Sequence, residues 1–293
     1  MYELHVHLDG SIRRKTFLEL AKLYNIDVKS DFGFRKGMSL LDALGMFHKT
    51  VAVMKDMDNI TRITSELCDD LKNDGVEYAE IRFAPQLHAK NIDMVIDAAH
   101  RGLKHDFNLI LCGLYGEHPS MLENLVEIGK NYKSVVGIDI AGAPQNNHKY
   151  GLLDYKDVFV EAKNLGFGTT AHVSEGRDAI EIWQAITYLE VTRLGHATTL
   201  LETPWLVEVL RDKNVTIEAC VTSNVQTGLF YSASEHPIKK WIELDIPVAI
   251  CADNTLMSKI TTSQEIEKLK KECGLTKKHI DHCFAAAKKS RFY

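Results

Sequence analysis

The stretch VVGIDIAGAPQNNHKYGLLDYKDVFVEAKNLGFGTTAH, residues 135–172, decides the fold class of this chain. It begins and ends with short β-branched runs, VVGIDIA (135–141) and GTTAH (168–172). Between them, YKDVFVEAKNLG (155–166) carries an apolar stripe at helical spacing. A strand, a helix and a second strand in this order predict parallel pairing, because the crossover returns the chain to the same end of the sheet.

The same alternation continues in both directions along the chain. Eight strands are expected, at residues 2–7, 76–83, 107–114, 135–141, 168–172, 191–195, 215–220 and 247–252. Helical patterns separate them; one, residues 59–73, is ended by Gly75, and another has Thr203 as its expected N-cap and Pro204 as its first residue. Eight strands in 293 residues predict an α/β protein, a single (β/α)8 TIM-type barrel over residues 1–293.

A doubly wound open sheet is the alternative architecture. That fold is expected to place a glycine-rich phosphate loop directly after its first strand. The segment HLDGSI (7–12) at this position is not such a loop, so the closed barrel is the better prediction.

The composition excludes several classes of function. Apolar residues make up 45% of the chain and the net charge is −5, so we expect a globular protein that binds no nucleic acid. The opening MYELHVHLDG resembles no secretory signal, and no uncharged apolar run is long enough to span a membrane. Six scattered cysteines without a CxxC pair indicate free thiols and a cytoplasmic protein. Any metal must then be held by histidine and carboxylate groups.

Polar side chains gather at the carboxyl ends of the predicted strands. His5 and His7 end the first strand, His172 ends the fifth, His196 follows the sixth and Asp253 follows the eighth. Active sites of barrels lie at this rim. Taken alone, two histidines two residues apart are more often structural, but alternate strand residues share a face and here meet other candidate ligands. Three imidazoles and a carboxylate suit Zn²⁺ with a position open for water.

Three further rim residues each allow two or more interpretations. Glu175 is either a first-turn helix acid or a general acid and base beside the metal, and the shared rim favours the second. His196 could be a fourth ligand, a core residue or a donor that stabilises developing charge, and its spacing does not decide between these. Gly142 marks a simple turn or a close backbone approach to a flat ligand. The remaining histidines are not expected to be catalytic: 48, 88, 100, 105, 118, 148, 236, 279 and 282.

At these residues the chain strongly resembles the adenosine deaminase family of the amidohydrolase superfamily. The matching motifs run in family order: ELHVHLDGSI (3–12), EIRFAP (80–85), IDIAG (138–142), AHVSEG (171–176), RLGHATTL (193–200), TSNVQTG (222–228) and ADNTLMS (252–258). The chain departs from the commoner pattern at Asn254, where many members have aspartate, and at the Val173–Ser174 pair.

The resemblance implies one Zn²⁺ per chain, held by His5, His7, His172 and Asp253. It assigns proton transfer at purine N1 to Glu175, and it implies that His196 and Asp253 orient the hydrolytic water. The catalytic residues expected from it are therefore Glu175, His196 and Asp253.

The resemblance also implies a set of substrate contacts. Gly142 would meet purine N3, Asn254 would face N7 and Asp9 would reach the ribose end, with His7 also among the substrate-binding residues. The implied reaction converts adenosine, and 2′-deoxyadenosine, to inosine and ammonia in purine salvage. The alternatives are deamination of adenine, a 5′-modified adenosine or an N6-substituted nucleotide, or nucleoside binding without turnover. The expected partner is a small purine nucleoside, with no nucleic acid or membrane.

Overall fold

The computed structural model describes residues 1–29 and 31–293, and eight parallel strands form its centre. The strands are β1 (Tyr2–His7), β2 (Tyr78–Phe83), β3 (Asn108–Leu114), β4 (Val135–Ala141), β5 (Gly168–Val173), β6 (Arg193–His196), β7 (Thr216–Ala219) and β8 (Val248–Ile250). Each strand pairs with the next in chain order.

The barrel closes where β1 meets the segment that follows β8. Val6 bridges to Asp253, the His7 amide donates to the Asp253 carbonyl (2.7 Å), and the Asp253 amide donates to the His5 carbonyl (2.9 Å). The predicted (β/α)8 barrel is therefore confirmed. The closing contact also brings Asp253 to the end of β1, beside two of the candidate ligands.

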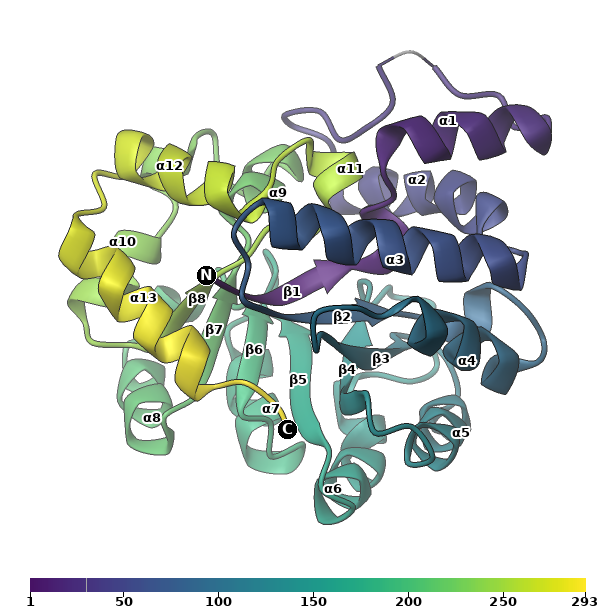
Figure 1. Ribbon diagram of the computed structural model, residues 1–293. Helices are drawn as coiled ribbons and strands as arrows, with labels where there is room; N and C mark the ends of the chain where they lie inside the picture. The colour runs from purple at the N-terminus through teal and green to yellow at the C-terminus, as the bar shows by residue number, and fades with distance from the viewer. Residues whose placement is uncertain (30) are drawn as a thin grey trace.

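Helices surround the strands, as Figure 1 shows. They are α1 (Arg14–Leu23), α2 (Leu40–Val53), α3 (Met57–Asn73), α4 (Ile92–Gly102), α5 (Pro119–Gly129), α6 (Lys156–Asn164), α7 (Ile180–Tyr188), α8 (Trp205–Lys213), α9 (Val221–Gln226), α10 (Ile238–Glu243), α11 (Thr255–Ser258), α12 (Thr262–Glu272) and α13 (Lys277–Lys289). Their apolar faces form one large hydrophobic core with the outer face of the barrel.

Several predicted strand and helix boundaries shift by one or two residues, and two of these shifts have a clear local cause. Strand β6 begins at Arg193 rather than at Val191, because the Val191 amide still donates to Ala185 at the end of α7. Helix α8 begins at Trp205 with Pro204 as its N-cap, so the expected capping role of Thr203 is wrong. The stop at Gly75 is confirmed: α3 ends at Asn73, and Gly75 has a φ of +89°, the left-handed conformation that favours glycine.

The interior of the barrel contains a fully buried network of charged side chains. The Arg82 guanidinium lies 2.8 Å from both Asp139 and Glu218, and that of Arg193 lies 2.6 Å from Glu80 and 2.7 Å from Glu218. Buried charges are tolerated when each is paired. This network lies beneath the rim residues and ties four strands together.

The C-terminal segment covers the opposite end of the barrel. The Phe292 ring centroid lies 3.6 Å from the Arg193 guanidinium, and the Phe292 amide donates to Glu80 (2.7 Å). Phe292 fits because β5 begins with Gly168, where a Cβ atom would come within 2.0 Å of the ring. Phe292 thus closes the end of the barrel opposite the candidate site.

None of the helices in the described ranges is both long and apolar enough to cross a membrane. Within the same ranges all six cysteines are buried and free, as expected from their spacing.

Candidate active site

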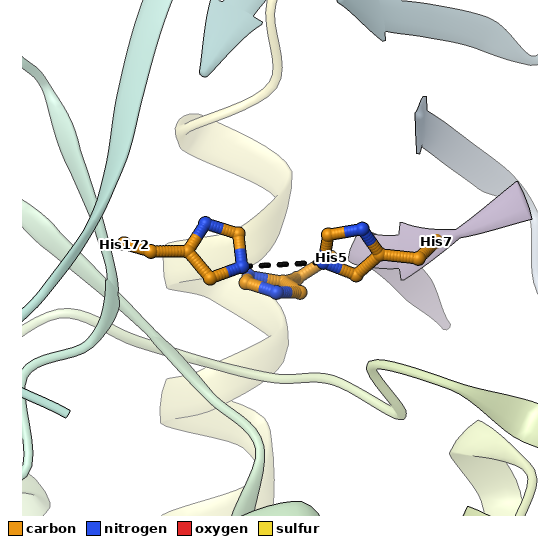
Figure 2. Close-up of side chains that lie close together, drawn as sticks. All are labelled: His5, His7 and His172. Carbon is orange, nitrogen blue, oxygen red and sulfur yellow. Dashed lines mark hydrogen bonds between the residues drawn. The ribbon is translucent and has the colours of Figure 1, made fainter. Parts of the chain in front are cut away.

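Strand β1 supplies two imidazoles that lie on the same face at the barrel mouth. His5 and His7 are two residues apart, and alternate side chains of a strand point to one side. His172, near the end of β5, approaches them from across the barrel (Figure 2). One nitrogen from each of the three rings lies within 4.8 Å of the other two, so the three rings could share one metal ion.

Asp253 adds a carboxylate to this cluster. Its Oδ1 lies 3.6 Å from Nε2 of His5 and 3.5 Å from Nε2 of His7. Its backbone has a φ of 63°, and the pairing with β1 holds it in this uncommon conformation. A conformation of this kind is retained only where the surrounding structure enforces it.

The donor set fits a zinc ion on two observations. Nε2 of His5 is buried and has no hydrogen-bond partner among the described residues. Nε2 of His7 lies 3.2 Å from Nε2 of His172, so two ring nitrogens point at each other, as the dashed line in Figure 2 marks. Three imidazole nitrogens and a carboxylate oxygen that converge in this way match the ligands of catalytic zinc.

Two buried carboxylates fix the orientation of the ligand rings. Nδ1 of His5 lies 2.7 Å from Glu218, and Nδ1 of His172 lies 3.0 Å from Asp139. A carboxylate that accepts the Nδ1–H leaves the Nε2 lone pair free toward the metal. Both acids in turn bind Arg82. Sequence reasoning assigned no role to these three residues, although each is a charged residue within a predicted strand.

Burial keeps two of the three rings neutral. It lowers the pKa of His7 to about 3 and also lowers that of His172. His5 differs: burial and Arg82 lower its pKa, but Asp253 and Glu218 outweigh them and raise it. Neutral imidazole is the form that donates a lone pair to a metal.

Glu175 and His196 lie together beside the cluster. Burial, reinforced by the charge of Asp253, raises the pKa of Glu175 to about 7. Nδ1 of His196 lies 3.9 Å from the Glu175 carboxylate, and burial lowers the pKa of His196 well below its ordinary value. His196 lies outside the three-histidine group.

Asn224 of α9 connects these two side chains, and sequence reasoning did not single it out. Its Nδ2 lies 3.1 Å from Nδ1 of His196 and 3.5 Å from Oε1 of Glu175. His236 in turn lies 3.3 Å from the Asn224 Oδ1. The available signal was the TSNVQTG motif (222–228), whose polar residues directly follow the seventh strand.

A cavity of about 320 Å³ opens above these groups. The structure brings every predicted site residue except the deeper His5 to its wall: His7, Asp9, Gly142, His172, Glu175, His196, Asp253 and Asn254. Its apolar lining includes Phe34, Leu40, Leu44, Phe47, Leu87 and Leu114. The described residues that line it include no lysine or arginine.

The predicted substrate contacts have suitable local geometry. Gly142 has a φ of +80°, and no atom lies within 4 Å of the position its Cβ would take, so a flat ligand can approach its backbone. The Asn254 Oδ1 lies beside Gly10, where a Cβ would lie 1.7 Å from it, and Asn254 lines the cavity. Nε2 of His88 lies 3.8 Å from Oδ2 of Asp9.

Comparison with known proteins agrees with this geometry. The family model described as Adenosine deaminase matches residues 1–293. The chain is 34% identical to an adenosine deaminase from Clostridium botulinum (strain 657 / Type Ba4) over 296 residues, which cover 94% of this chain and 88% of the relative. In fold it is similar to an adenine deaminase from Arthrobacter aurescens (TM-score 0.90, 20% identity, 100% and 93% of the two chains covered). It is also similar to an N6-mAMP deaminase from Arabidopsis (TM-score 0.85, 24% identity, 100% and 93% covered). The chain belongs to the adenosine deaminase family.

Proposed function

We propose that this chain is a zinc-dependent hydrolase that converts adenosine and 2′-deoxyadenosine to inosine and ammonia in purine salvage. The observation that carries the proposal is the convergence of three histidines, Asp253 and Glu175 on one cavity. We also propose that residues 1–293 act as one domain, since β1 and the segment after β8 both contribute to that cavity.

His5, His7, His172 and Asp253 would hold the ion. When bound there, zinc supplies a water whose pKa is lowered toward roughly 7, a nucleophile available at neutral pH. Glu218 and Asp139 hold the rings so that Nε2 of His5 and of His172 face the ion. Arg82 holds both carboxylates in place from below.

In this proposal Glu175 moves the protons. With a pKa of about 7 its carboxyl is partly protonated at neutral pH, and it can donate a proton to purine N1. Protonation at N1 makes C6 more open to attack by water. When water adds at C6, one of its protons returns to the Glu175 carboxylate. The proton of the new C6 hydroxyl group passes to the departing amine, so that the carbonyl forms and ammonia leaves. His196, neutral and fixed by Asn224, lies where it can orient the attacking water.

The cavity lining favours an uncharged nucleoside over a nucleotide. A phosphate group is bound best by lysine or arginine, and neither is among the described residues that line this cavity. Arg177 lines an adjoining hollow, but its Nε lies 2.8 Å from Glu181 and the two charges are paired. Asp9 favours a nucleoside over free adenine, because a carboxylate at the wall is matched by a ribose hydroxyl.

Ammonia release from a panel of aminopurines tests the proposal. The panel contains adenosine, 2′-deoxyadenosine, adenine, 5′-methylthioadenosine, AMP and N6-methyl-AMP, each with and without a chelator. We expect the highest kcat/KM for the two nucleosides, and loss of turnover when metal is removed. A preference for a nucleotide or for adenine would replace the substrate assignment, and binding without turnover of any member would contradict the enzymatic proposal.

A further inference from the structure

We infer that Glu181, on α7, is a positioning residue that holds Glu175 in place through the backbone of Ser174. The inference rests on the proposed function, because it assigns a task to a residue only if Glu175 moves protons. Glu181 lies outside the cavity wall, and neither the motifs nor the comparisons give it a role.

The starting observation is how few contacts the Glu175 carboxyl itself makes. Among the described residues, its nearest polar partners are Asn224 Nδ2 at 3.5 Å and His196 Nδ1 at 3.9 Å. Neither contact is short enough to fix the carboxyl firmly. The position of this side chain must therefore be set by the backbone on either side of it.

That backbone is in a conformation that needs support. Ser174 has a φ of 51°, in the left-handed region that residues other than glycine rarely adopt. Such conformations persist where neighbouring groups enforce them. Here the Ser174 amide donates to Oε2 of Glu181 at 2.6 Å, and its Oγ donates to the carbonyl of Asp178 at 2.9 Å.

The loop after β6 holds the other side of the same segment. The hydroxyl of Thr198 donates to the Ser174 carbonyl (2.7 Å) and accepts from the Gly176 amide (2.9 Å). Hydrogen bonds thus hold the backbone on both sides of Glu175, at Ser174 and at Gly176. Of these supports, Glu181 alone reaches the buried Ser174 amide.

Arg177 keeps the Glu181 carboxylate in position. Its Nε lies 2.8 Å and 3.1 Å from the two carboxylate oxygens, and its Nη2 donates to the His172 carbonyl (3.4 Å). The Glu181 side chain is 16% exposed and that of Arg177 is 19% exposed, so solvent screens the pair only in part. Without the acceptor at Glu181, a buried amide would lose its partner and Ser174 could relax to an ordinary φ. Glu175 would move with it.

The experiment is a double-mutant cycle on adenosine turnover with Glu181→Ala and Glu175→Gln. We expect Glu181→Ala to lower kcat by about tenfold or more, since displacement of a reacting group by about 1 Å costs up to a hundredfold. KM and zinc content should change by less than about threefold. In the Glu175→Gln background the same substitution should lower kcat by less than about twofold, because its effect passes through Glu175.

Three further variants separate positioning from general destabilisation. Glu181→Gln restores an acceptor for the Ser174 amide, and its kcat should return to within about threefold of the original. Glu181→Met keeps the length of the side chain but has no carboxylate. We expect it to lower kcat by about tenfold or more, and it replaces Glu181→Ala in the cycle if the alanine variant does not fold. Asp97→Ala breaks a matched i,i+4 pair with Arg101 on α4, where both side chains are about half exposed, and should leave kcat unchanged.

Independent, multiplicative effects of Glu181→Ala and Glu175→Gln would overturn the inference, as would a kcat unchanged by both Glu181→Ala and Glu181→Met. An original protein that deaminates no member of the aminopurine panel would instead contradict the proposed function.

Discussion

The Glu175 carboxyl combines burial with a neighbouring negative charge, and both effects keep its proton bound near neutral pH. A group with a pKa of about 7 is well suited to exchange protons with a purine ring. Both effects support the proposal that Glu175 acts as a general acid. An exposed first-turn helix acid would lack this shift.

Glu175→Gln tests this assignment directly. The amide has the size of the acid but cannot transfer a proton to N1, so kcat should fall by at least about a hundredfold. Zinc content should stay near one ion per chain, because the substitution leaves the four proposed ligands, His5, His7, His172 and Asp253, unchanged. Turnover and metal analysis of the same preparation are the measurements. Activity within about tenfold of the original would leave Glu175 as a helix-start acid only.

A second prediction concerns Asn254 and its proposed contact with purine N7. Purine N7 is an acceptor, and an asparagine NH₂ donates at any pH, whereas an aspartate must first be protonated. Asn254 lines the cavity, and we propose that its NH₂ donates to purine N7. We expect 7-deazaadenosine to lose about 2–3 kcal/mol in kcat/KM relative to adenosine, since a buried donor is left without a partner. Asn254→Ala should remove the difference; equal kcat/KM for both nucleosides in the original protein would contradict N7 recognition.

Among the elements, the short helix α9 depends on a neighbour. Its first turn contains Thr222, whose amide donates to Glu265 of α12 at 2.8 Å and whose hydroxyl donates to the same carboxylate. Lys268 also contacts the Thr222 hydroxyl (2.9 Å). Because α9 carries Asn224, the α12 contact supports the residue that connects His196 and Glu175.

Glu265 makes stability depend on pH. Burial raises its pKa in the folded chain, so the folded state binds this proton more tightly than the unfolded state. Its contribution is complete below the ordinary glutamate pKa of about 4.3, and it is lost as pH rises toward the folded value. The free energy of unfolding, measured in urea, should fall over this range relative to that of Glu265→Gln, which does not titrate. A constant difference between the two proteins would show that Glu265 titrates normally.

The elements also show what a sequence can and cannot predict here. Residues at the rim were predictable, because the end of a parallel strand fixes which end of the barrel they occupy; this holds for His5, His172 and Asp253. The role of Arg82 was not predictable, because it depends on contacts with Asp139 and Glu218, which lie 57 and 136 residues away in the chain. The apolar wall from α2 was also missed, since the pattern of residues 40–53 gives no indication that the helix lies over the cavity.

In the whole molecule, the candidate zinc site joins segments that are far apart in the chain. His5 and His7 belong to the first strand, His172 to the fifth, and Asp253 follows the last. An ion bound by all of them links the two ends of the barrel where it closes. Binding to the folded state alone stabilises it by RT ln(1 + [Zn]/Kd), roughly 2.7 kcal/mol at a hundredfold excess over Kd.

Removal of the metal should therefore lower the Tm by several degrees, and added zinc should restore it. Metal analysis of the untreated protein should give about one zinc per chain. His7→Ala removes a ring whose Nε2 lies 3.2 Å from that of His172, so this variant should lose most of its zinc and show no chelator-dependent change in Tm. His48→Ala, an exposed histidine on α2, is the matched control and should respond to chelator as the original protein does. If His7→Ala retains full zinc and full activity, His7 is not a ligand of the ion and the proposed set of three histidines and Asp253 is wrong.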